Sequence, residues 1–246
     1  MANTLIPGDF VLVNIAEYQL NTPSEIPILG LPVHSFNLFN TGKPQVNDIV
    51  LIQLPGFYTS DYSKTKTHLI KRIIAGPGDT FQIINKKIYV NGIEKFLPPT
   101  AKHTFNSVKS NSDESEGIFF KGSGWNGDNY GPVIIPAKGD TLPINPGNIH
   151  KWKQLIVLEY NDLVVREEGS VITIKDKPVQ NYIVKKDHYF VIGDNFDNSK
   201  DSRYIGFINE DLILGKIWFI YWSKDPYKKD GNIFSGIRWE RIFTGF

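Results

Sequence analysis

The chain has 246 residues and a balanced charge, with 27 Lys and Arg residues against 26 Asp and Glu residues. This balance indicates no broad electrostatic surface for nucleic acid or anionic lipid, and the absence of cysteine excludes disulfides, zinc–thiolate sites and thiol nucleophiles. No apolar run approaches the roughly 20 residues of a membrane span, and Asp9 interrupts the first apolar stretch, so no signal-peptide pattern is present.

Abundant aromatic and β-branched residues in the first part of the chain favour strands. Short apolar runs between turn-forming residues predict five strands, at Phe10–Val13, Asp48–Leu54, His68–Ile74, Phe81–Ile84 and Ile88–Val90. Residues 21–45 are rich in Pro, Asn and Thr and are expected to form a long loop.

The second part of the chain predicts a helix and further strands. A short helix is expected over Asn148–Gln154, with Asn148 as its N-cap, and a helical turn over Asn209–Leu214. Strands are expected at Leu155–Leu158, Leu163–Val165, Val171–Ile174, Tyr189–Ile192 and Ile217–Trp222. The predicted fold is all-β and mainly antiparallel, with a few short helices. We expect residues 1–95 plus 185–246 to form the main β domain, and residues 96–184 an inserted, smaller β subdomain.

A polar stretch at Gly193–Arg203 lies between two strand-like apolar runs. Strands at both ends could aim its hydroxyls and carboxylates, and functional side chains often occupy such loops on a rigid scaffold. The alternative is a connection in which Asp and Asn side chains bind their own backbone. Composition alone leaves both interpretations open.

Lys71 is the charged strand residue that could carry chemistry. Alternation along the strand places it on the apolar face of Leu69 and Ile73. Burial disfavours an ammonium group and lowers its pKa, which would make the neutral amine a general base. The alternative is a lysine whose stem covers apolar surface while its amine reaches water.

Taken together, these stretches resemble the bacterial type I signal peptidases, serine peptidases with a Ser/Lys dyad. Two boxes in the first part of the chain are Met1–Asp9, similar to S-M-x-x-T-L-x-x-G-D from its Met, and Asp48–Val50, similar to G-D-I-V with Asn47 at the usual Gly. Three more boxes follow. Lys71–Asp79 resembles K-R-x-x-G-x-P-G-D, and Gly193–Arg203 resembles G-D-N-R-x-x-S-x-D-S-R with Phe196 at the usual Arg. Ile237–Ile242 resembles the closing strand of the family. The middle of the chain resembles the family's variable insert.

The resemblance implies a signal-peptidase-like β fold and a role for each matching residue. Lys71 would be the general base, and Ser199 would hydrogen-bond its amine and orient it. Four residues would support them: Asp194 and Asn195 by fixing the loop, and Asp201 and Arg203 as an ion pair. With Phe196 in place of Arg, we expect a repacked loop rather than lost chemistry.

The implied reaction is acyl transfer through a serine nucleophile, without metal or organic cofactor. Shallow apolar pockets for small side chains would be lined by Met1, Leu5, Leu69 and Ile70, which suits signal peptides ending in Ala-x-Ala. The resemblance therefore implies preprotein signal peptides as substrates. It places the domain at the outer face of the bacterial cytoplasmic membrane, anchored by an upstream segment outside this chain, with no nucleic-acid partner.

The nucleophilic serine of the family directly precedes the residue that is Met1 here, so it is absent from the chain, as are the oxyanion-hole residues and the anchor expected upstream. Three explanations stand: a truncated fragment of a membrane-anchored peptidase, a naturally degenerate homologue that binds peptides without cleaving them, or another serine as nucleophile. The resemblance assigns no attacking role to Ser202. We expect residues 1–246 alone not to cleave peptides.

Other function classes are open as well. Asp197, Ser199 and Asp201 alternate as in a calcium loop, but Ser202 occupies the position of its Gly and Ile208 that of its Glu. Self-cleaving repressors share Ser/Lys chemistry, yet their DNA-binding domain does not fit the neutral charge. A non-catalytic peptide-binding β module is the main alternative to an enzyme.

Because the substrate of such a peptidase arrives from the bilayer, an exposed apolar surface near the site is expected to face the membrane surface. Phe10, Trp218 and Trp222 could contribute to it, or could pack in the core.

Overall fold

Antiparallel pairing organises the fold. The computed structural model describes residues 1, 4–21, 37–56, 66–105, 107–110, 113–160, 164–228 and 234–246. Its main sheet has the order β1-β17-β4-β5-β15-β16. The strands are β1 (Asp9–Asn14), β17 (Ile213–Ser223), β4 (Ile49–Leu54), β5 (Thr67–Ala75), β15 (His188–Ile192) and β16 (Ile208–Asn209). Neighbouring strands in this sheet are antiparallel.

A second antiparallel sheet continues from the main one through the turn at Gly76–Asp79, where Gly78 adopts φ +81° and the Asp79 carboxylate accepts from Gly76 N. Its order is β8-β7-β6-β9. The strands are β6 (Thr80–Ile84), β7 (Lys87–Val90), β8 (Ile93–Lys95) and β9 (Tyr130–Ile134). Since β9 pairs with β6, residues from the predicted insert share a sheet with residues of the predicted main domain. The division at 96–184 stays a prediction.

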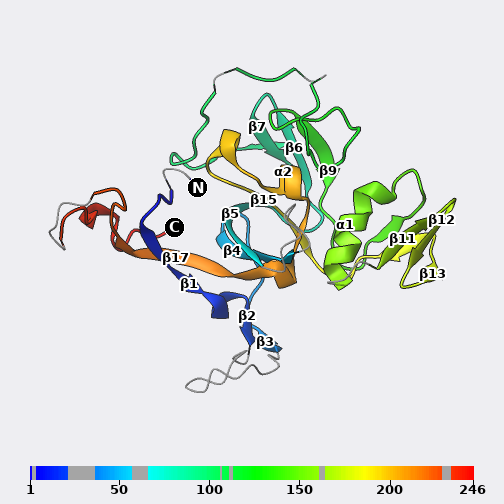
Figure 1. The fold of residues 1–246 in the computed structure, drawn as a ribbon, viewed down its shortest axis with the longest axis horizontal. Helices are drawn as coiled ribbons and strands as arrows, with labels where there is room; N and C mark the ends of the chain where they lie inside the picture. Colours follow the sequence, from blue (N-terminus) through cyan, green and yellow to red (C-terminus); the bar gives the residue numbers. More distant parts are fainter. Residues whose placement is uncertain are drawn as a thin grey trace.

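The remaining elements are small. Three further sheets are formed by β2 (Gln19–Asn21) with β3 (Asn37–Asn40), by β10 (Thr141–Pro143) with β14 (Asn181–Ile183), and by β11 (Val165–Glu168), β12 (Val171–Ile174) and β13 (Lys177–Pro178). The helices are α1 (Ile149–Tyr160) and α2 (Ser202–Ile205), with 3-10 turns at Ile15–Glu17, Phe196–Asn198, Glu210–Leu212 and Trp239–Arg241. Figure 1 shows α1 and the β11–β13 sheet on the side of the molecule away from β1.

The core has two parts, and they flank the strand pair β5–β15. One packs Val50, Ile73 and Val191 from three neighbouring strands of the main sheet. The other lies under the second sheet and α1 and contains stacked aromatic rings, with Phe81 and Phe190 4.1 Å apart between centroids. These packed strands give the polar loop after β15 a rigid base.

The predicted all-β, mainly antiparallel fold with few short helices is confirmed, with two corrections. Leu155–Leu158 is not a strand, because it continues α1, where all four side chains are buried. A short apolar run cannot distinguish a buried strand from a buried helix turn. Within the predicted loop 21–45, residues 37–40 form β3, and residues 22–36 lie outside the described residues. Leu163 of another predicted strand also lies outside them, and β11 begins at Val165.

The burial of Leu155–Leu158 in α1 predicts that truncating a side chain there destabilises the protein more than truncating an exposed one. Ile156 is 0% exposed in α1, and Ile93 is 64% exposed in β8. Ile156→Ala should lower the free energy of unfolding by about 2–5 kcal/mol, since it leaves a cavity. Ile93→Ala should change it by less than about 0.5 kcal/mol. Urea unfolding of both variants measures the difference, and equal changes would contradict the placement of Ile156 in the core.

Candidate active site

Lys71 lies in the middle of β5, opposite Val50 of β4, and its side chain is buried. Burial is the largest influence on the pKa of its amine and lowers it. The Asp201 carboxylate raises this pKa, Arg203 lowers it, and Asp194 raises it. The outcome is a pKa below the ordinary lysine value, so a larger share of the amine is neutral than on a surface lysine.

Ser199 lies beside Lys71, within the polar loop that follows β15. Its Oγ is buried and has no hydrogen-bond partner within the described residues, so the expected hydrogen bond to the lysine amine is not made in this structure. A Cβ atom at Gly193 would overlap Ser199 Oγ and lie 3.5 Å from Lys71 Nζ. The bare glycine therefore leaves the hydroxyl and the amine in one small shared space.

Asp201 and Arg203 form an ion pair that is almost completely buried. Arg203 Nε donates to Asp201 Oδ1 and Nη2 to Oδ2, both at 2.9 Å. Gly193 N also donates to Asp201 Oδ2, at 3.2 Å. Two further guanidinium N–H groups donate to the carbonyl oxygens of Gly127 and Phe196, at 3.0 and 2.6 Å. The pair therefore ties the two ends of the loop together, since both Gly193 and Arg203 bind Asp201.

Phe196 replaces an arginine of the family pattern and is buried inside this loop. The guanidinium of Arg203 lies over its ring, 4.0 Å from the centroid, and the His103 ring packs 4.7 Å away on centroid distance. A cation over an aromatic face is an attractive arrangement. The loop thus contains a packed ring at a position where an arginine would add hydrogen bonds.

Asp194 is held by a cation that the sequence reasoning did not assign to the site. Arg72, the neighbour of Lys71, donates from Nε to Asp194 Oδ1 at 3.0 Å and from Nη2 to Oδ2 at 2.8 Å. Thr4 Oγ1 donates to the same carboxylate. Side-chain alternation concealed this contact, because successive strand residues face opposite sides of a sheet and Arg72 is therefore expected on the face away from Lys71.

A segment of the predicted insert crosses the polar loop at Lys102, which the sequence reasoning also missed. Lys102 N donates to Asp194 O at 2.6 Å, and Phe196 N donates to Lys102 O at 3.0 Å, which forms a parallel bridge beside Asn195. The Asn195 side-chain oxygen is buried and has no partner within the described part of the chain. Backbone pairing through Lys102 therefore fixes the position of Asn195.

The backbone nitrogen of Met1 lies in the same environment. Burial lowers the pKa of this amine most, and the charge of Lys71 lowers it further, while Asp194 and Asp201 raise it. Asp194 N contacts Met1 Sδ at 3.5 Å, and Leu5 N donates to Met1 O at 2.7 Å. A residue joined to the Met1 nitrogen would therefore start from an atom close enough to Lys71 to interact with its charge.

The residues expected to line substrate pockets are partly exposed. Met1, Leu5, Leu69 and Ile70 are each of intermediate burial, and the last two immediately precede Lys71 on β5. Ser202 is different, because it is fully buried and its Oγ accepts from Val191 N at 2.9 Å. Its hydroxyl therefore serves the packing of the loop on β15.

The calcium interpretation is disfavoured by the partners of its carboxylates. Asp197 binds Lys86 at 2.9 Å and accepts from Thr104 N and Phe105 N, while Asp201 binds Arg203. No group of three His, Asp or Glu side chains among the described residues is arranged to hold a metal ion.

Several large apolar side chains of β1 and β17 are exposed, among them residues named for the expected membrane-facing surface, which stays a prediction. Phe10 is 50% and Trp218 46% exposed, and Trp222 is partly exposed. Leu12 and Tyr221 add to this surface. None of the helices in the described ranges has both the length and the apolar character to cross a membrane.

Comparisons of the sequence and the structure with known proteins were consistent with one another in the family that they indicate. Residues 1–222 match the protein family described as signal peptidase, peptidase S26. Signal peptidase I of Buchnera aphidicola subsp. Schizaphis graminum is 30% identical over 98% of this chain and 70% of its own length. Signal peptidase I of Helicobacter pylori is 26% identical over 99% of this chain and 81% of its own length. A crystal structure of a signal peptidase I from Enterococcus faecalis V583 is 19% identical, with a TM-score of 0.35 over 71% of this chain and 97% of that chain.

The crowding at Gly193 predicts a specific effect of adding one methyl group. Gly193→Ala should lower the free energy of unfolding by about 1–3 kcal/mol, because the new Cβ overlaps Ser199 Oγ. Gly76→Ala is the matched control, since the nearest atoms to its Cβ are 3.8 Å away and its φ is not left-handed. Chemical denaturation compares them, and a Gly193→Ala protein as stable as the Gly76→Ala protein would contradict the geometry.

The electrostatics of Lys71 predict its titration. NMR of the lysine side chains should give Lys71 a pKa below the usual 10.5, and Lys43, which binds Asp187, a pKa above it. In Asp201→Asn the pKa of Lys71 should fall further, because the carboxylate that favours the ammonium is lost and Arg203 is left unpaired. A rise in the pKa of Lys71 in this variant would refute the assignment.

Proposed function

The chain belongs to the signal peptidase family, peptidase S26, and from this premise we propose that it removes signal peptides by a Ser/Lys mechanism in which Lys71 is the general base. Family membership makes it a peptidase whose substrates are preproteins that carry signal peptides, and the bacterial members are membrane-associated. The outer face of the cytoplasmic membrane is the proposed location.

The buried Lys71 amine is the observation that supports the proposal most. A lysine with a pKa near 10.4 is neutral only about once in 2500 molecules at pH 7, a deficit of roughly 4.6 kcal/mol. Burial reduces this deficit by lowering the pKa. Ser199 Oγ shares the space beside the amine, and its free hydroxyl is positioned to orient it.

The proposed nucleophile is a serine joined to the Met1 nitrogen. The charge of Lys71 lowers the pKa of this nitrogen, so the two groups are close enough to interact. Neutral Lys71 takes the proton of the serine hydroxyl while the serine oxygen attacks the scissile carbonyl. The resulting ammonium then protonates the leaving amine, so an acyl-enzyme and the mature amino terminus form. Lys71, neutral again, takes a proton from water while the water oxygen attacks the ester carbonyl. The ammonium then returns this proton to the serine oxygen as the acyl–oxygen bond breaks and the signal peptide leaves with a free carboxyl end. A hydrogen-bond donor is also required, to stabilise the negative oxygen that forms when the serine attacks the carbonyl.

The proposed substrate pockets are formed by Met1, Leu5, Leu69 and Ile70, each of which is half-buried. Two of them directly precede Lys71 on β5, and alternation places Leu69 on the same face as the proposed base. A shallow apolar surface would accept small side chains, as in an Ala-x-Ala signal-peptide end.

Cleavage of an Ala-x-Ala peptide tests the proposal on a polypeptide that carries a serine joined to the Met1 nitrogen. This protein should cleave the peptide, and Lys71→Ala should reduce kcat by about 10²–10⁴-fold, the usual contribution of a general base. Lys200→Ala is the matched control, because Lys200 is an exposed lysine of the same loop. It should leave kcat unchanged.

Two results would count against the proposal. Equal turnover in the parent protein and in Lys71→Ala would exclude Lys71 as the base. Peptide binding with the same affinity in both proteins, without cleavage by either, would favour the non-catalytic peptide-binding β module instead.

A further inference from the structure

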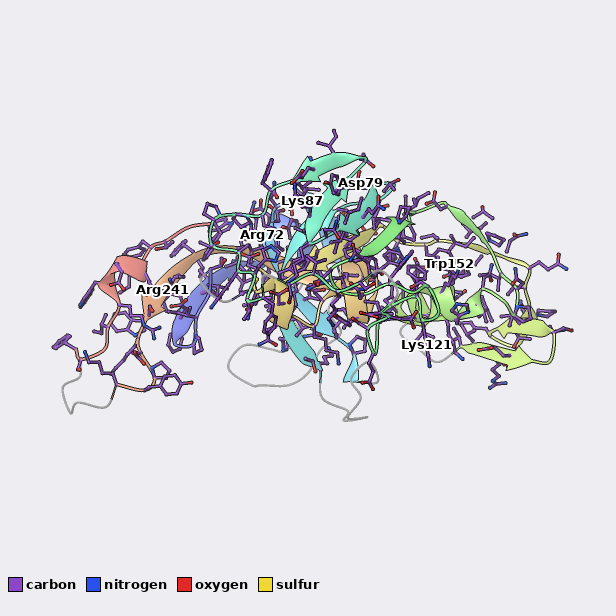
Figure 2. The ribbon with its side chains drawn as sticks, turned by 90° about the horizontal axis from the view of Figure 1, so that it is seen from above. Arg72, Asp79, Lys87, Lys121, Trp152 and Arg241 are labelled. Atoms are coloured by element: carbon purple, nitrogen blue, oxygen red, sulfur yellow. The ribbon has the colours of Figure 1, made fainter. Side chains whose placement is uncertain are left out.

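A groove far from Lys71 along the chain lies between the loop at residues 118–125, strand β9 and the first turn of α1. It has a volume of about 670 Å³, within the range of pockets that bind small ligands or several side chains. Its main lining residues are Phe120, Lys121, Trp125, His150, Lys151 and Trp152. Figure 2 labels Lys121 and Trp152, which lie in the same part of the molecule beside α1.

Three aromatic rings form the inner surface of this groove. The Phe120 ring meets Trp125 edge-on, with centroids 5.6 Å apart, and meets Trp152 edge-on at 6.1 Å. Ile134 of β9 lines the same groove and is 63% exposed. Trp125 and Trp152 are each only partly buried. Aromatic and apolar surface is therefore available to a partner, and a flat apolar side chain suits such rings.

The loop that carries Phe120 is held in an uncommon conformation. Phe120 has φ +68°, which is rare for a bulky residue. The Glu114 carboxylate accepts from Gly122 N at 3.1 Å and from Gly124 N at 2.7 Å. Phe119 N donates to Arg203 O at 2.8 Å. The loop is thus fixed at both ends before any partner binds, and preorganisation lowers the entropic cost of binding.

The ionisable side chains that line the groove are two lysines and a histidine. Lys121, His150 and Lys151 are exposed at its rim, and no acidic residue lines it. None of the ion pairs found within the described residues involves Lys121 or Lys151. The acid whose pKa Lys121 influences, Glu114, already accepts the two glycine N–H groups. The groove therefore complements a negatively charged ligand.

We propose that this groove binds an acidic peptide segment that carries an aromatic side chain. The ring would lie against Trp125, Phe120 and Trp152, and flanking carboxylates would bind Lys121 and Lys151. A saccharide site would need carboxylate or amide partners for hydroxyl groups, and the lining contains neither. Nucleic acid would need a longer basic track than two lysines and a histidine, on a chain of net charge +1.

Fluorescence polarisation with a labelled Glu-Asp-Phe-Asp-Glu peptide tests this proposal on the whole chain. Binding should be saturable, and Lys121→Glu and Lys151→Glu should each raise Kd roughly tenfold. Both lysines are exposed, so the fold should be kept. Lys177→Glu on β13 is the matched control, with the same charge change on an exposed residue outside the groove, and should leave Kd unchanged.

Four outcomes would overturn the proposal. Unchanged Kd in both groove variants would place binding elsewhere, and equal binding of Glu-Asp-Ala-Asp-Glu would exclude recognition of the ring. Tighter binding of an oligothymidylate, or of vesicles rich in anionic lipid, would assign these lysines to nucleic acid or to a membrane instead.

Discussion

The buried ion pair between Asp201 and Arg203 is the interaction on which the site depends. Both side chains are taken out of water, which is tolerable because nearly every donor and acceptor of the pair has a partner. Leaving one charge of such a pair without the other costs about 3–5 kcal/mol. The two residues therefore stay together, and the loop that begins at Gly193 is closed by their bond.

The same pair explains how Lys71 can be buried near two carboxylates and still have a lowered pKa. An isolated carboxylate nearby would stabilise the ammonium and raise the pKa. Asp201 does so, but Arg203 acts in the opposite direction. Asp194 is in turn neutralised by Arg72. With each carboxylate paired to an arginine, burial has the largest influence on Lys71.

The longer strands, such as β4, β5 and β17, were predictable because each contains a short apolar run between turn residues, and burial of β4 and of the second half of β5 follows from nearly continuous apolar sequence. Strands such as β9, β10 and β14 were not predicted, because they are short and have no long apolar run that marks them. The helical state of Leu155–Leu158 was not predictable, since a run of four apolar residues shows neither the helical nor the strand periodicity. Within the site, the positions of Lys71 and of Asp201 with Arg203 follow from motif order. The crossing at Lys102 depends on backbone hydrogen bonds over about 90 residues of chain separation, which side-chain patterns do not encode.

The region 96–184 contacts the polar loop Gly193–Arg203 and the residues that follow it, through bonds between residues distant in sequence. Gly127 O accepts from Arg203 Nη1, Phe119 N donates to Arg203 O, and Gln154 Nε2 donates to Ile205 O. If this region were removed, Arg203 Nη1 would lose its bond to Gly127 O, and the Arg203 backbone would lose its bond to Phe119 N. Because the Arg203 charge also acts on Lys71, the region 96–184 supports the electrostatics of the proposed base as well as the shape of the loop.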